Sequence, residues 1–136
     1  MPSLLYLVKQ LELAVRARLD ELVRGHGITA LQYTALTVLE RHDGLSAAQL
    51  ARDTFVTAQS MADMVRALET RHLIRRERNP VNRRELLIHL TAEGRSLLTA
   101  VATPVRDLES RMIATLTKDQ SDDFRQHLIM AWQALA

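Results

Sequence analysis

The feature that most constrains the fold is the block from about Leu45 to Thr91, in which two short capped helices run into a basic hairpin. Ser46 and Gln49 have the spacing of a capping box and predict the start of a short helix. Thr57 can cap a second helix that ends near residue 71. Because only a few residues separate the two helices, the pair predicts a helix-turn-helix.

The periodicity changes after the second helix. Residues 73–77 and 86–90 are short runs of β-prone side chains, and the segment between them begins with the turn-forming sequence Arg-Asn-Pro-Val-Asn at 78–82. This pattern predicts a β-hairpin directly after the helix-turn-helix. Together the two units predict a winged helix-turn-helix.

The N-terminal third predicts two longer helices. The chain has only four glycines and three prolines, so few residues interrupt helices. Residues 3–24 carry leucine and valine at steps of three and four, and residues 30–41 form a second apolar run. The first of these helices is apolar on more than one face, which favours burial against a partner subunit.

The C-terminal third predicts two further helices. Thr91 can cap a long helix to about Thr115, and Pro104 inside it is expected to kink it. Thr117 and Gln120 form a capping box for the last helix. The expected fold class is therefore mainly α with a small β-hairpin, in the order α-α-α-α-β-β-α-α, as a single domain over residues 1–136.

Composition excludes several classes of function. The 136 residues include no cysteine, so disulfides and thiolate metal sites are ruled out. Lys9 and Glu12 interrupt the apolar N-terminus before it is long enough to span a membrane, so we expect a cytoplasmic protein without membrane contact. The five histidines are scattered, and no nucleophile-elbow, phosphate-loop or dinucleotide motif is present. We therefore expect no enzyme, no metal and no cofactor.

The positive charge is concentrated. Between Arg71 and Arg84 the chain carries six arginines and one acid, a local charge of +5, whereas the rest of the chain sums to −3. A compact basic patch on a slightly acidic body suggests a local anionic partner. On charge alone, a solvated arginine-rich hairpin fits the sequence equally well.

The second helix of the pair has the dimensions to enter a DNA major groove, which is about 12 Å wide. On its outward face Gln59 can contact adenine, Arg66 guanine or phosphate, and Asp63 the N4 amine of cytosine. Arg83 and Arg84 are the best candidates on the hairpin, where they would lie near phosphates or in the minor groove. The residues expected to contact DNA are Ser46, Gln49, Thr57, Ala58, Gln59, Ser60, Asp63, Arg66, Arg76, Asn79, Asn82, Arg83 and Arg84.

Residues 45–94 resemble the multiple antibiotic resistance regulator (MarR) family. The motifs that carry the resemblance are Leu68-Glu69, Leu73-Ile74-x-Arg76, Arg83-Arg84 and Leu90-Thr91-x-x-Gly94. The resemblance implies a homodimeric regulator, usually a repressor, that reads a pseudopalindromic DNA site and is often released by a small aromatic ligand. It places the DNA-binding lobe at 30–91, the recognition helix at about 57–71, the wing at about 75–90 and the helical dimerisation region at 1–25 and 92–136.

Three positions depart from the family pattern. In similar members two acids flank the wing-tip arginine, which corresponds to Arg84 here, but this chain has Asn79 and Asn82 at those positions. His72 stands where a glycine usually ends the recognition helix. For a ligand pocket between the first, second and fifth helices, the candidates are Arg16, His26 and Tyr33.

The alternative function is a winged-helix module that binds protein and does not read DNA.

Overall fold

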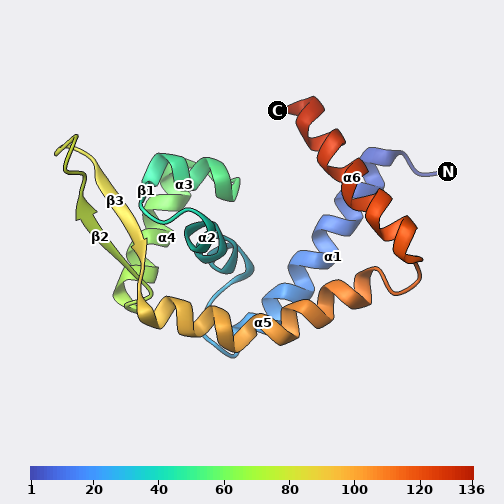
Figure 1. The fold of residues 1–136 in the computed structure, drawn as a ribbon, viewed down its shortest axis with the longest axis horizontal. Helices are drawn as coiled ribbons and strands as arrows, with labels where there is room; N and C mark the ends of the chain where they lie inside the picture. The colour runs from blue at the N-terminus through green and yellow to red at the C-terminus, as the bar shows by residue number, and fades with distance from the viewer. The chain divides into compact units, whose positions relative to one another are not determined.

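The computed structural model describes residues 1–136, and the mainly α fold class is confirmed (Figure 1). Six helices and three short strands follow one another along the chain. Their bounds are α1 Leu4–Arg24, α2 Ala30–Arg41, β1 Leu45–Ser46, α3 Ala47–Thr54, α4 Ala58–Thr70, β2 Ile74–Arg78, β3 Leu86–Leu90, α5 Ala92–Met112 and α6 Lys118–Leu135. We call α2 through β3, Ala30–Leu90, the winged-helix lobe.

The sheet has three antiparallel strands in the order β1-β3-β2, so the expected two-stranded hairpin was incomplete. The added strand β1 is only two residues long, and Leu45 pairs with Ile88 while Ser46 pairs with Leu87. Two residues are too few to show the alternating pattern by which a strand is predicted. They form a strand only by pairing with residues more than 40 positions away in the sequence. Another expectation was also inexact, since α5 ends at Met112 and not near Thr115.

The predicted helix caps are confirmed. Ser46 and Gln49 form the capping box of α3, and Thr117 and Gln120 form that of α6. The Thr57 side chain accepts from the backbone N–H of Ser60 at 3.1 Å at the start of α4. Each cap binds a backbone N–H that the first helical turn leaves without a partner, so the sequence could specify these helix starts locally.

The end of α4 needs a left-handed residue, and His72 supplies it with a φ of 60°. Its backbone N–H donates to the Glu69 carbonyl at 2.9 Å, and the N–H of Leu73 donates to the Leu68 carbonyl at 3.0 Å. These two bonds are those of a Schellman motif, in which glycine is the usual left-handed residue. The turn therefore keeps its geometry with histidine in place of the family's usual glycine.

The core of the lobe lies where α2, α3, α4 and the sheet meet. Met61, Val65 and Leu68 line the buried face of α4, whereas Met64 is only half-buried. Leu39 of α2 is fully buried, and Ile88 of β3 is 1% exposed. This apolar packing fixes which face of α4 turns outward.

The chain divides into two compact units, Met1–Thr103 and Pro104–Ala136, and the boundary falls at the proline inside α5. The first unit contains α1 and the whole winged-helix lobe. The second contains α6, in which no residue is buried. No helix is both long and apolar enough to cross a membrane.

Candidate nucleic-acid interface

The outward face of α4 is short, polar and accessible. Gln59, Asp63 and Arg66 are exposed on the side opposite Met61 and Val65. Ala58 is also exposed and carries no bulk, so a partner surface can approach the first turn of the helix closely. The side chains expected to face a DNA groove therefore share one face of this helix.

The first turn of α4 presents hydroxyl groups beside backbone N–H groups. Thr57 donates from its hydroxyl to Oγ of Ser60 at 3.1 Å, in addition to capping the helix. Free N–H groups and the positive end of the helix dipole favour an anion at such a position. The geometry is compatible with the DNA contacts expected of both residues, and it favours phosphate as their target.

Asp63 and Arg66 pair with each other across one helical turn. Both side chains are more than 60% exposed, so the pair contributes little to stability. In the unbound chain the Arg66 charge is therefore balanced by its neighbour. A base or phosphate contact by Arg66 requires that this pair rearrange.

The start of α3 uses its polar side chains internally. Oε1 of Gln49 accepts from the N–H of Ser46 at 2.9 Å, and Oγ of Ser46 accepts from the N–H of Gln49 at 3.2 Å. Ser46 is only 8% exposed, whereas Gln49 is exposed. Of the two expected contact residues at this helix start, Gln49 is the better placed, because its amide nitrogen is not used in the cap.

Four of the six arginines in the basic block are held by partners within the chain. Arg71 donates to the Gly27 carbonyl at 2.8 Å, and Arg78 donates to the Arg83 carbonyl at 2.8 Å. Arg75 pairs with Glu77 and Arg76 with Glu69, as their N···O distances of 2.6 and 2.8 Å show. The guanidinium groups of Arg83 and Arg84 make no such contact.

The Arg76–Glu69 pair ties β2 to α4. The guanidinium donates twice to the carboxylate, at 3.1 and 2.8 Å. This hydrogen bonding lowers the pKa of Glu69 and raises the pKa of Arg76. A bidentate pair fixes direction as well as distance, so Arg76 orients the wing against the helix and is less available to DNA than expected.

The two asparagines at the wing tip organise its turns. Oδ1 of Asn79 accepts from the N–H of Val81 at 2.9 Å, and Oδ1 of Asn82 accepts from the N–H of Arg84 at 3.3 Å. Nδ2 of Asn79 also donates to Glu85 at 3.1 Å. Asparagine and aspartate both form such turns with Oδ1, so the tip stays ordered without the acids of similar members.

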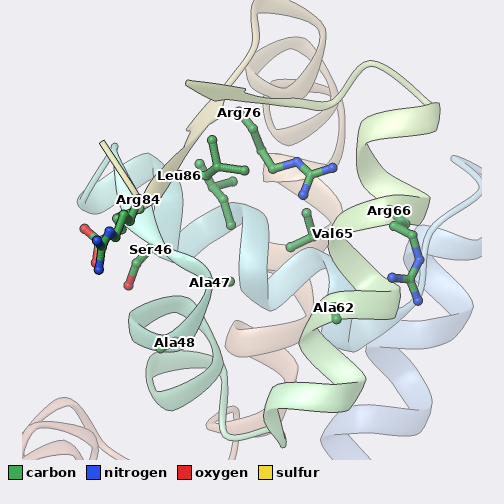
Figure 2. A pocket seen from close by; sticks show the side chains of 11 residues that line it. Ser46, Ala47, Ala48, Ala62, Val65, Arg66, Arg76, Arg84 and Leu86 are labelled. Carbon is green, nitrogen blue, oxygen red and sulfur yellow. The ribbon is translucent and has the colours of Figure 1, made fainter. Parts of the chain in front are cut away.

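A hollow of about 470 Å³ lies between α3, α4 and the wing (Figure 2). In Figure 2, Arg84 lies beside Ser46 on one side of it and Arg66 on the other. Its floor is apolar, with Val65, Leu86 and Ile88 among the lining residues. Arg66, Arg76 and Arg84 all line this hollow together with Glu85, and of these arginines only Arg84 has no carboxylate partner.

The three candidate ligand residues do not gather at one pocket. His26 lines an open cavity of about 600 Å³ together with Arg71, Glu93 and Leu97, but neither Arg16 nor Tyr33 lines it. Arg16 pairs with Glu12 on the exposed surface of α1. Tyr33 is half-buried, and this burial, followed by the charge of Glu40, raises the pKa of its hydroxyl.

Sequence reasoning missed one conspicuous residue, Phe55, in the turn between α3 and α4. Its φ is 64°, in the left-handed region, and its side chain is 80% exposed. The available signal was an aromatic residue in a tight turn, where glycine or asparagine is favoured. Sequence reasoning named Glu69 only within a family motif and missed its pairing with Arg76, which is close only after β2 has folded against α4.

Comparison with known proteins agrees with this arrangement. The sequence model of the MarR family matches residues 26–85. A helix-turn-helix transcriptional repressor of Mycobacterium tuberculosis is 32% identical over 123 residues, which cover 90% of this chain and 88% of that protein.

Two solved structures extend the likeness over nearly the whole chain. A "probable transcriptional regulator" from Pseudomonas aeruginosa has a TM-score of 0.84 and 26% identity, with 95% of this chain and 96% of that one covered. The MepR protein of S. aureus, in a complex with DNA, has a TM-score of 0.87 and 21% identity, with 98% and 99% covered, and shares the fold. The chain therefore belongs to the MarR family of winged helix-turn-helix transcription regulators.

Proposed function

We propose that this protein is a homodimeric repressor that binds double-stranded DNA through α4 and the wing. The observation that carries the proposal is the division of the arginines. Four of the six in the basic block are held within the chain, and Arg83 and Arg84 are exposed at the wing with free guanidinium groups. Unpaired arginines beside an exposed helix face are what a polyanionic groove requires.

In this arrangement α4 enters the major groove and the wing reaches the neighbouring backbone or minor groove. Gln59 is the first candidate for reading a base, because its exposed amide can make two bonds to adenine. Thr57 and Ser60 are assigned to phosphate, and Asp63 and Arg66 to bases once their mutual pair opens. Support for the mode comes from MepR, which has this fold and was solved with DNA.

We assign the terminal helical regions, residues 1–25 and 92–136, to dimerisation because they expose many apolar side chains. Near the N-terminus Leu4 and Leu5 are 80% and 79% exposed. On α6, Trp132 is 59% and Leu135 is 86% exposed, and no residue of that helix is buried. Apolar surface of this extent is typical of an interface, and two copies would present two lobes to a pseudopalindromic site.

We assign the regulatory ligand, a small aromatic acid, to the cavity beside His26. The Arg71 guanidinium lines this cavity and also donates to the Gly27 carbonyl, so it connects the α1–α2 loop to the residue that follows α4. An anion that attracts Arg71 would loosen that connection and shift α4. Adding benzoate should then raise the Kd for DNA of the wild type and not of Arg71→Ala; equal effects on both would exclude this cavity.

The DNA-binding proposal is tested with duplexes that the wild-type protein selects from a random-sequence pool. Arg84→Ala should weaken binding to every duplex and lower the slope of log affinity against log salt by about one for each lobe. Gln59→Ala should instead relax the preference at particular base pairs. Arg41→Ala, an exposed and unpaired arginine at the end of α2 that is not among the expected DNA contacts, is the matched control and should change neither quantity.

A protein-binding module that does not read DNA is the alternative. It predicts that no sequence is enriched from the pool and that Arg84→Ala leaves affinity for DNA unchanged at low salt. Either enrichment or a charge-dependent loss at Arg84 would exclude it.

A regulator of transcription acts on the chromosome, so we assign the protein to the cytoplasm.

A further inference from the structure

Phe55 stands at a position that folding alone does not favour. The turn after α3 is a Schellman motif, in which the N–H of Phe55 donates to the Arg52 carbonyl at 3.3 Å and the N–H of Val56 to the Ala51 carbonyl at 3.1 Å. The motif requires a left-handed residue, and Phe55 has a φ of 64°. For a bulky side chain this backbone conformation is strained, whereas glycine adopts it freely.

The ring gains nothing from burial in return for this strain. Its side chain is 80% exposed, and the neighbouring Thr54 and Val56 are buried and half-buried instead. Within α3, the turn and α4, Phe55 is the only large hydrophobic residue that is exposed. A strained backbone and an exposed ring at one residue point to a contact made outside the folded chain.

The position of Phe55 selects the partner. It precedes Thr57, the N-cap of α4, by two residues, so their Cα atoms lie at most about 7 Å apart. The ring thus stands beside the end of α4 that enters the major groove under the proposed function. A phenyl ring has no hydrogen-bond donor or acceptor, and the distinctive apolar group in that groove is the C5-methyl of thymine.

We infer that Phe55 is a specificity-determining residue that recognises a thymine methyl group next to the bases read by α4. This inference rests on the proposed function and adds a base preference that none of the polar side chains of α4 supplies. Because the contact is apolar, it contributes to sequence preference and leaves the salt dependence unchanged.

The test is a thymine-to-uracil scan of a duplex that the wild-type protein selects from a random-sequence pool. Uracil pairs as thymine does and lacks only the methyl group. At one thymine in each half-site, the wild type should lose about fourfold in affinity, the value for burying one methyl group. Phe55→Gly should bind the thymine and uracil duplexes equally at that position, while losses at other thymines remain as in the wild type.

Two variants separate this contact from a general loss of folding. Phe55→Gly should have a Tm at or above that of the wild type, because it relieves the left-handed strain. Phe55→Asn, which tolerates the same backbone conformation, should reproduce the lost thymine preference without added flexibility. A large drop in Tm in both variants would show that the ring packs within the protein, and would overturn the inference.

The remaining outcomes are also decisive. If wild type and Phe55→Gly show the same losses at every thymine, the ring reads no methyl group and only this inference fails. If the wild type enriches no duplex at all, the proposed function fails and this inference fails with it.

Discussion

The winged-helix lobe and helix α6 have opposite relations to their own apolar residues. In the lobe, Leu36, Leu39 and Leu50 are fully buried, and the packing comes from helices and strands of the same chain. In α6, Leu128, Ile129 and Trp132 are all at least 40% exposed. The difference indicates that the lobe holds a complete core, whereas the chain leaves the apolar side chains of α6 uncovered, as the proposed dimer requires.

The largest expected effect is Leu39→Ala, which removes a fully buried side chain from the lobe. Truncation of a buried leucine costs about 2–5 kcal/mol of unfolding free energy. Urea denaturation should show this loss at every protein concentration. The matched variant Leu128→Ala, at a 43% exposed position, should lower stability only through the monomer–dimer equilibrium, so its effect should depend on concentration.

Equal, concentration-independent losses in Leu39→Ala and Leu128→Ala would contradict the distinction. They would mean that the chain itself covers α6.

Gly94→Ala should have the next largest effect, because the residue is packed against the backbone of the lobe. A Cβ atom there would lie 2.4 Å from the Leu73 carbonyl oxygen and 2.6 Å from Cδ1 of Leu90. We expect a loss of about 1–3 kcal/mol, typical of overpacking, measured by urea denaturation. Gly25→Ala is the control, since no atom lies within 4 Å of its added Cβ, and it should change stability much less.

The smallest expected effect concerns the pH dependence of the lobe. Burial alone would raise the pKa of the Asp43 carboxyl, but hydrogen bonds from the Leu90 N–H at 2.8 Å and from His89 at 3.0 Å outweigh it, and the pKa is lowered. Because the pKa of Asp43 is lower in the folded chain than in the unfolded chain, the carboxylate stabilises the fold at pH values above its ordinary pKa of about 4. That contribution is lost as the pH falls through the folded-state value.

Asp43→Asn should therefore reduce stability at neutral pH by less than about 1 kcal/mol, since the Asp43 side chain is 39% exposed and screened by solvent. Below about pH 4 the variant and the wild type should converge in Tm. Asp119→Asn is the comparison. The Asp119 carboxylate has no hydrogen-bond partner, so this variant should not show the same convergence with pH. A constant gap between Asp43→Asn and wild type across this range would contradict the assignment.

Local chemistry made most of the fold predictable from the sequence. The caps at Ser46, Thr57 and Thr117 depend on residues within one helical turn, so the sequence specifies them without tertiary information. Strand β1 was not predictable, because two residues become a strand only by pairing with Leu87 and Ile88.

The candidate site was predictable in residue type and less so in pairing. The basic block and the outward face of α4 follow from composition and helical period. The engagement of Arg71 by Gly27 and of Arg76 by Glu69 depends on which elements meet in space. The sequence favoured Arg83 and Arg84 on the hairpin, but it could not show which partners engage the other four arginines of the basic block.

Sedimentation velocity of the protein with a selected duplex, together with a hydroxyl-radical footprint, tests the central claim most directly. Two self-contained lobes joined through their terminal helices should give two chains per duplex and two protected regions about one helical turn, some 10 base pairs, apart. Arg84→Ala should lower occupancy of both regions together. One chain on a single protected region, or a duplex that stays unbound at low salt, would contradict the account.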